Sequence, residues 1–160
     1  MKIALISDIH DNIWNLSKAL KAIEGADVLL CLGDLCSPFI IPRLEQDFAG
    51  KPIHIILGNN DGDLLRIARN AAKFPNIHLE GEFFQGDLGG MKIAAVHYDN
   101  MAEPLIGSGT YDLVCYGHNH KARIDKRRDT LAINPGTIMG YDPIKAIDVP
   151  ATYALVDTYS

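Results

Sequence analysis

Short apolar runs alternate with amphipathic segments over the first half of the chain. The β-rich runs are 2–7, 27–32 and 52–57, and the segments with helical periodicity are 12–24, 38–48 and 61–74. Alternation of this kind is typical of α/β folds, in which helices cover a sheet of parallel strands. The runs at 28–32 and 53–57 are almost continuously apolar, which predicts central parallel strands with both faces covered.

The second half of the chain has a different pattern. Two pairs of short β-rich segments are each joined by a turn-forming loop, which predicts two hairpins. The paired segments are 82–85 with 91–96, and 122–126 with 130–134. A further strand is expected at 152–156, after a loop at 140–150. Because no repeat or linker divides the sequence, we expect a single domain over residues 1–160.

Composition limits the classes of protein to which this chain can belong. A chain of 160 residues, 48% of them apolar, can hold one hydrophobic core without disulfides or a structural metal. Its 15 Lys and Arg are outnumbered by 20 Asp and Glu. General nucleic-acid binding needs clustered basic residues, so this acidic balance argues against it.

Two features bear on where the protein resides. The three cysteines are Cys31, Cys36 and Cys115, an odd number, and two of them lie in apolar runs, which predicts free thiols rather than a disulfide framework. The apolar run at 3–6 is too short for a signal peptide or a membrane span. A cytoplasmic protein without membrane contact is therefore expected.

Acidic, amide and imidazole side chains gather directly after the expected strands. The clusters are Asp8-Ile9-His10, Gly33-Asp34, Gly58-Asn59-Asn60-Asp61, His97 and Gly117-His118-Asn119-His120. Because the carboxyl ends of parallel strands meet at one edge of a sheet, we expect these side chains to converge there. The remaining histidines, His54 and His78, lie within or beside strands, and we expect a structural role for them.

Seven of these side chains are candidate metal ligands. They are the carboxylates of Asp8 and Asp34, the amide of Asn59 and the imidazoles of His10, His97, His118 and His120. Donors of these kinds suit divalent Mn, Fe, Ni, Co or Zn, and the absence of thiolates argues against structural zinc. Seven ligands are too many for one ion, whereas two ions that share a carboxylate need about that number.

These motifs resemble those of the calcineurin-like metallophosphoesterase superfamily, and they occur in the same order. The residues that carry the resemblance are Asp8-x-His10, Gly33-Asp34, Gly58-Asn59-x-Asp61, His97 and Gly117-His118-x-His120. Segments 7–12 and 134–137 also resemble the small single-domain prokaryotic phosphodiesterases of this superfamily. The resemblance implies a four-layer αββα sandwich, in which helices flank two mixed sheets and the metal site lies at the carboxyl ends of the strands.

The resemblance also implies how two divalent transition-metal ions would be held, with Mn as the first choice. The ligands implied for one ion are Asp8, His10 and His120, and those implied for the other are Asn59, His97 and His118. Asp34 is implied as the ligand that bridges both ions.

The chain departs from the superfamily pattern at two positions. Many members have a His where Asn60 stands, and that His is thought to protonate the leaving group. A carboxamide cannot donate this proton at neutral pH, so Asp61 or a metal-bound water would have to replace it. Asn60 and Asp61 are therefore the candidate catalytic residues. Tyr98 stands where Gly is common, and it would either narrow the pocket beside a base or aryl group or simply pack.

The activity implied by the resemblance is that of a phosphodiesterase, a hydrolase that cleaves a P–O bond with a metal-bridging hydroxide. Two divalent ions, two carboxylates and one hydroxide leave one positive charge, which matches a small phosphodiester monoanion. Two alternatives stay open, a phosphomonoesterase, which would need further cations, and a non-catalytic interaction scaffold with the same fold. Homo-oligomerisation also stays open. The basic residues at 121–128 are expected to form a solvated face.

Overall fold

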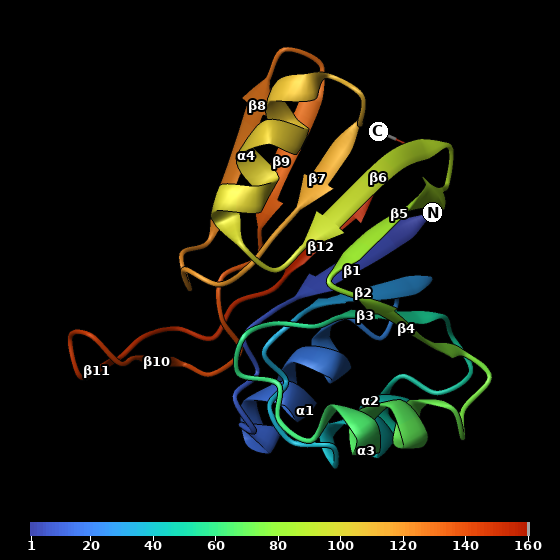
Figure 1. Ribbon diagram of the computed structural model, residues 1–160, viewed down its shortest axis with the longest axis vertical. Helices are drawn as coiled ribbons and strands as arrows, with labels where there is room; N and C mark the ends of the chain where they lie inside the picture. Colours follow the sequence, from blue (N-terminus) through green and yellow to red (C-terminus); the bar gives the residue numbers. More distant parts are fainter. Residues whose placement is uncertain (160) are drawn as a thin grey trace.

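Two five-stranded β-sheets stack against each other, and helices cover their outer faces (Figure 1). The computed structural model describes residues 1–159. The first sheet has the order β12-β1-β2-β3-β4. Its strands are β1 (Lys2–Ile6), β2 (Val28–Leu32), β3 (Ile53–Ile56), β4 (Ile77–Gly81) and β12 (Ala154–Asp157). Strands β1 to β4 are parallel, and β12 is antiparallel to β1.

The second sheet has the order β5-β6-β7-β9-β8, with parallel strands at its centre and antiparallel strands at its edges. Its strands are β5 (Phe83–Leu88), β6 (Met91–Val96), β7 (Leu113–Cys115), β8 (Arg123–Arg127) and β9 (Thr130–Asn134). Both predicted hairpins are present, as β5–β6 and β8–β9. Two mixed sheets flanked by helices confirm the αββα architecture.

The helices lie on the face of each sheet that points away from the other sheet (Figure 1). They are α1 (Ile13–Ala22), α2 (Ile40–Asp47) and α3 (Leu64–Ala71) on the first sheet, and α4 (Asp99–Ser108) on the second. A short hairpin of β10 (Tyr141–Asp142) and β11 (Ile147–Asp148) extends away from both sheets. None of the helices in the described part of the chain has the length and hydropathy needed to cross a membrane.

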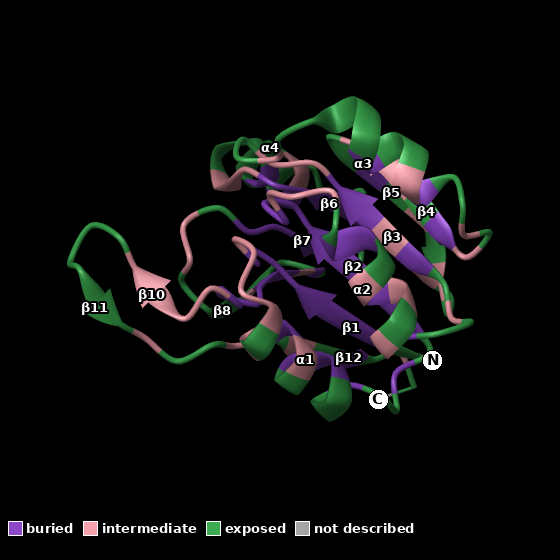
Figure 2. Cartoon of the chain, turned by 90° about the horizontal axis from the view of Figure 1, so that it is seen from below, coloured by how far each residue is buried: buried purple, intermediate pink, exposed green. Residues whose placement is uncertain are grey.

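Strands β1 and β2 of the first sheet are buried on both faces (Figure 2). In β1, Leu5 belongs to the core between the sheets, whereas Ala4 and Ile6 belong to the core beneath the helices. Successive side chains of a strand point to opposite faces, so a strand covered on both sides has to be apolar throughout. This requirement explains the continuous apolar runs in the sequence.

Four parts of the fold differ from the expected elements. Helix α4 and strand β4 were not predicted, and the loop expected at 140–150 contains β10 and β11. Helix α4 carries Pro104 in its interior. Because proline normally ends a helix, the sequence of this segment does not predict one. Strand β5 continues to Leu88 and so includes part of the turn-forming loop expected between 82–85 and 91–96.

Substitution of Leu30 tests the core between the sheets. Leu30 is fully buried in the central strand β2, so we expect Leu30→Ala to lower the free energy of unfolding by about 2–5 kcal/mol. Leu155→Ala is the control, because Leu155 is 51% exposed on the edge strand β12, and it should cost no more than about 0.5 kcal/mol. Urea unfolding followed by circular dichroism measures both values. Equal losses would contradict the assignment of Leu30 to the core.

Candidate metal centre

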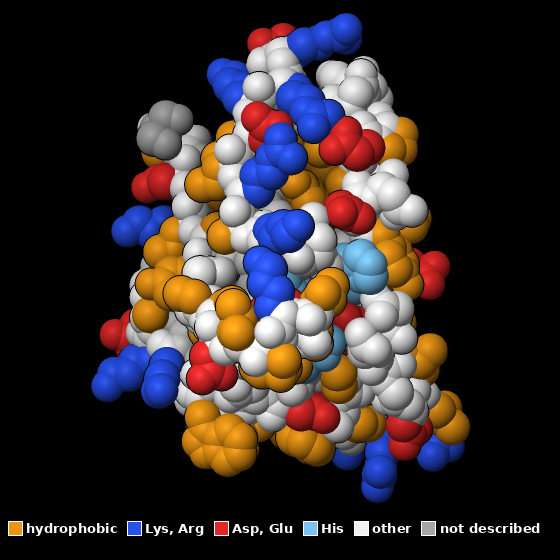
Figure 3. Space-filling model, turned by 90° about the vertical axis from the view of Figure 1, so that its left-hand side faces the viewer, with side chains coloured by type: hydrophobic (Ala, Val, Ile, Leu, Met, Phe, Trp, Pro, Cys, Tyr) orange, Lys and Arg blue, Asp and Glu red, His pale blue; other side chains and the backbone are white. Residues whose placement is uncertain are grey.

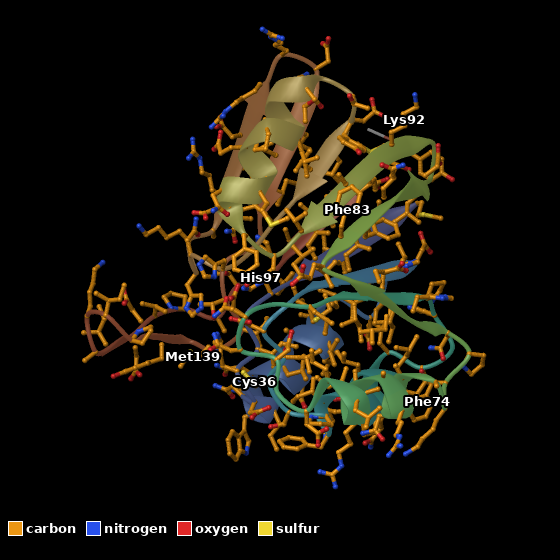
Figure 4. The ribbon with its side chains drawn as sticks, in the orientation of Figure 1. Cys36, Phe74, Phe83, Lys92, His97 and Met139 are labelled. Carbon is orange, nitrogen blue, oxygen red and sulfur yellow. The ribbon has the colours of Figure 1, made fainter. Side chains whose placement is uncertain are left out.

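Five loops meet where the central strands of both sheets end. The first sheet contributes the loops after β1, β2 and β3, and the second contributes the loops after β6 and β7. Figure 4 shows His97 between the two sheets, on the side from which the β10–β11 hairpin extends. The clusters that follow the strands in the sequence therefore come together at one edge of the molecule, as expected for parallel strands.

Two compact groups of candidate ligands share Asp8. One comprises Asp8, His10 and His120, and the other comprises Asp8, Asp34 and His97; within each group the donor atoms lie within 4.8 Å of one another. Asp8 Oδ1 is 3.2 Å from His120 Nε2. Asp34 Oδ2 is 3.6 Å from His10 Nε2 and 3.4 Å from His97 Nε2. The Asp34 carboxylate thus lies between a histidine of each group.

The remaining two candidate ligands, Asn59 and His118, lie beside His97. Asn59 Oδ1 is 3.1 Å from His97 Nε2. The His118 ring lies 5.1 Å from the His97 ring, measured between centroids, but His118 is in neither compact group. Tyr98 contacts both of these rings edge-on, with centroid distances of 5.1 Å, which favours packing over contact with a substrate.

The histidines outside the clusters have other partners. His54 Nδ1 is 2.7 Å from Glu80 Oε1, and the His54 ring stacks on His78 with a centroid distance of 4.9 Å. Both side chains belong to β3 and β4 rather than to the loops at the strand ends. Their contacts agree with the structural role expected for them.

The buried carboxylate of Asp8 indicates that this site fits a cation. Asp8 Oδ1 accepts no hydrogen bond of good geometry, although His120 Nε2 lies 3.2 Å away, and it is the sole buried side-chain atom in this condition among residues 1–159. A buried anionic oxygen without a partner is costly. In addition, His10 Nε2 and His120 Nε2 face each other at 3.3 Å. Carboxylate and imidazole donors that converge in this way suit divalent transition metals.

Several candidate ligands have a left-handed backbone. The φ angles are +54° at Asp8, +44° at His10, +55° at Asp34, +70° at His118 and +58° at His120. Such a conformation costs a residue other than Gly about 1–3 kcal/mol, and Asp and His tolerate it better than most. Strain of this kind gathers at functional sites, where the surrounding structure maintains it.

The orientation of His97 suits a metal ligand. Its Nδ1 donates a hydrogen bond to the Leu32 carbonyl at 2.7 Å, so Nε2 is the nitrogen that faces Asp34. A hydrogen bond at one ring nitrogen selects the tautomer whose other nitrogen can bind metal. Burial would lower the pKa of His97, but the hydrogen bonds with Asp34 and Leu32 outweigh it and raise the pKa.

Asn60 orients the Asp34 carboxylate. Its backbone N–H donates to Asp34 Oδ1 at 2.8 Å, and its side-chain amide donates to Asp34 Oδ2 at 2.8 Å. Burial would raise the pKa of Asp34, but hydrogen bonds from His97 and Asn60 outweigh it and hold the pKa well below its usual range. Asp34 is therefore a carboxylate over the whole pH range in which the protein would act.

Asp61 connects the loops after β2 and β3. Its Oδ2 accepts from the backbone N–H groups of Gly58, at 2.7 Å, and Asp34, at 3.2 Å. Its Oδ1 accepts from the Cys36 N–H at 2.8 Å. Burial raises the pKa of Asp61. These contacts give Asp61 a structural position behind the candidate ligands.

An open cleft of about 780 Å³ lies in front of the candidate ligands. Its lining includes His10, Asp34 and His118, and the opposite side is formed by the β10–β11 hairpin. Figure 3 shows histidine side chains reaching the surface on this face, beside a band of Lys and Arg. A substrate could therefore reach the ligands directly from solvent.

Sequence reasoning missed two parts of this cleft. Asp99, the first residue of α4, lines the cleft and accepts a hydrogen bond from Asn119 Nδ2 at 3.0 Å. An acidic residue in a first turn is a recognised signal for a helix start, but Pro104 conceals the rest of α4. The β10–β11 hairpin was the other missed part, because strands of two residues show no periodicity.

Known proteins are similar to this chain in sequence and in fold. The family model described as the calcineurin-like phosphoesterase superfamily domain matches residues 1–160. The chain is 32% identical over 145 residues to a phosphodiesterase of Methanocaldococcus jannaschii, a match that covers 88% of this chain and 86% of that protein.

Solved structures are also similar to this chain. An archaeal phosphodiesterase has 28% identity and a TM-score of 0.81, with 98% of this chain and 99% of the other covered. Vacuolar protein sorting 29 of Cryptosporidium parvum has 21% identity and a TM-score of 0.70, with 96% and 83% covered, which is a likeness of fold alone. The chain belongs to the calcineurin-like phosphoesterase superfamily.

Proposed function

We propose that this protein is a dinuclear metal-dependent phosphodiesterase that hydrolyses a small phosphodiester. Its membership of the calcineurin-like phosphoesterase superfamily and its similarity to a protein named phosphodiesterase indicate a phosphoric ester hydrolase. The observation that carries the dinuclear assignment is the position of Asp34 Oδ2, 3.6 Å from His10 Nε2 and 3.4 Å from His97 Nε2. A carboxylate between two sets of ligands is what a pair of ions requires.

The proposed ligand sets follow the two sides of Asp34. For one ion the set is Asp8, His10 and His120, and for the other it is Asn59, His97 and His118, with Asp34 shared. When bound, a pair of divalent ions lowers the pKa of a water that they share and neutralises phosphoryl oxygens. The donor set suits a divalent transition metal, and Mn is our proposed ion.

The remaining residues of the site act on the ligands. Asn60 is a positioning residue, because its two hydrogen bonds orient the Asp34 carboxylate. Asp61 holds the loops that carry Asp34 and Asn59. A proton-donor role for Asp61 stays a prediction. Burial raises the pKa of Asp61, which favours the protonated carboxyl, but both of its oxygens accept backbone N–H groups, which favours the carboxylate.

The charges around the cleft favour a diester over a monoester. Apart from the candidate ligands, the charged lining residues are Lys121, Lys145, Asp99 and Asp142. Two cations and two anions leave no net positive charge for the second negative charge of a monoester. A cytoplasmic location is also part of our proposal, because Cys31, Cys36 and Cys115 are free thiols.

Assays of the Mn-loaded protein test this proposal. We expect two ions per chain by elemental analysis, and a kcat/KM for bis(4-nitrophenyl) phosphate at least about tenfold above that for 4-nitrophenyl phosphate. Activity should disappear with a chelator and return with added Mn. A tenfold preference for the monoester would favour a phosphomonoesterase, and two bound ions without any hydrolysis would favour a non-catalytic scaffold.

A further inference from the structure

The β10–β11 hairpin forms a largely apolar side of the cleft. The hairpin residues that line the cleft are Asp142, Pro143, Ile144, Lys145, Val149 and Pro150. We call the four apolar members, Pro143, Ile144, Val149 and Pro150, the hairpin wall. His10 and His118 line the same cleft, so one ligand could contact the metal centre and the hairpin wall together.

The base of the hairpin is attached to the loop that carries Asp8. The Asp8 carbonyl accepts hydrogen bonds from Met139 N–H and from Thr137 Oγ1, both at 2.9 Å. Asn12 Nδ2 in turn donates to the Met139 carbonyl at 2.8 Å. Figure 4 shows Met139 near the point where the hairpin leaves the body of the molecule. The hairpin wall therefore has a defined position relative to the candidate ligands.

The hairpin wall exposes apolar surface that the rest of the chain does not cover. Ile144 is 94% exposed, although it lines the cleft. Removal of such surface from water by a ligand is favourable, by about 25 cal/mol per Å². The two prolines restrict the backbone on either side, which lowers the entropy lost when a ligand binds.

The charges near the hairpin argue against a second phosphate in this part of the cleft. Lys145 Nζ lies 3.7 Å from Asp142 Oδ2, so the cation of the hairpin is already paired. Asp142 Oδ1 also accepts the backbone N–H groups of Ile144 and Lys145, at 3.0 and 3.1 Å, which keeps this carboxylate at the tip. The hairpin therefore offers a ligand apolar contact rather than net charge.

We propose that the hairpin wall binds an apolar ester group of the phosphodiester, with the phosphate itself at the metal centre. This inference rests on the proposed function and narrows its substrate class. The substrate is a diester with an aryl, base-like or other apolar substituent, and it carries no additional phosphate next to the hairpin.

Binding of two unreactive phosphonates to the Mn-loaded protein tests the hairpin wall. Phenylphosphonate and methylphosphonate have the same anionic head and differ in apolar area. We expect phenylphosphonate to bind about tenfold more tightly to the wild type by calorimetry, and this ratio to fall to about twofold or less in the double variant Ile144→Ser, Val149→Ser. The Kd of methylphosphonate should change by less than about twofold.

Ile147→Ser is the matched control. Ile147 belongs to the same hairpin and is 49% exposed, but it does not line the cleft, so this variant should keep the tenfold ratio. An unchanged ratio in the double variant, or an equal loss in Ile147→Ser, would overturn the inference. If the wild type hydrolysed diesters but bound both phosphonates equally, the inference alone would fail. If it bound neither phosphonate and hydrolysed no diester, the proposed function would fail as well.

Discussion

Replacement of Asp34 by Asn should release both metal ions and reduce diester hydrolysis by about a thousandfold, or about 4 kcal/mol of transition-state stabilisation. Asp34 Oδ2 lies near His10 Nε2 and His97 Nε2, in the two different ligand sets. An amide has the shape of a carboxylate but no negative charge, and only one of its polar atoms can bind a cation. If Asp34 is shared by both ions, as we propose, its loss should affect both of them.

The experiment measures metal content after dialysis together with kcat/KM for an aryl diester. His120→Ala is the comparison, because His120 belongs to one ligand set, and it should loosen mainly one ion. Asp125→Asn is the control for loss of a carboxylate, since Asp125 pairs with Arg123 on β8, outside the cleft. Retention of two tightly bound ions by Asp34→Asn would contradict the bridging position of Asp34.

Much of the fold could be predicted because hydrophobic periodicity reports burial. Strand β2 is apolar at every position, and β1 and β3 are apolar except at Lys2 and His54, since these strands are covered on both faces; the sequence shows this directly. The edge strand β8 has four exposed residues and no buried one, so its prediction depended on the turn between it and β9. Elements with neither a clear hydrophobic periodicity nor a turn signal, such as α4 with its internal Pro104, were missed.

The convergence of the candidate ligands could be predicted for a topological reason. They follow parallel strands, and parallel strands bring distant parts of a chain to one edge, so the position in the sequence already indicated the position in space. The partners of these ligands could not be identified in this way. Asp61 accepts three backbone N–H groups from two loops, and a sequence contains no information on where a backbone amide points.

The second large effect that we expect is a steep dependence of the hydrolysis rate on the pKa of the leaving group, and it results from Asn60. Its side-chain amide donates to Asp34 and has no proton to give to an alkoxide. General-acid assistance contributes about 10²–10⁴-fold and matters most for poor leaving groups. We therefore expect aryl diesters to be cleaved readily and simple alkyl diesters more slowly by a comparable factor, unless Asp61 supplies the proton.

Two substitutions separate the missing proton donor from the hydrogen bond to Asp34. Asn60→Ala removes the side-chain hydrogen bond but keeps the backbone one, so it should lower kcat/KM for all diesters by a similar factor. Asn60→His also loses the amide, but its imidazole can protonate a leaving group, so it should help alkyl diesters more than aryl ones. The measurement is the slope of log kcat/KM against leaving-group pKa for the three proteins at equal metal content. Equal slopes in wild type and Asn60→His, or a nearly flat slope in wild type, would mean that the proton comes from elsewhere, and Asp61→Asn would then show whether that source is Asp61.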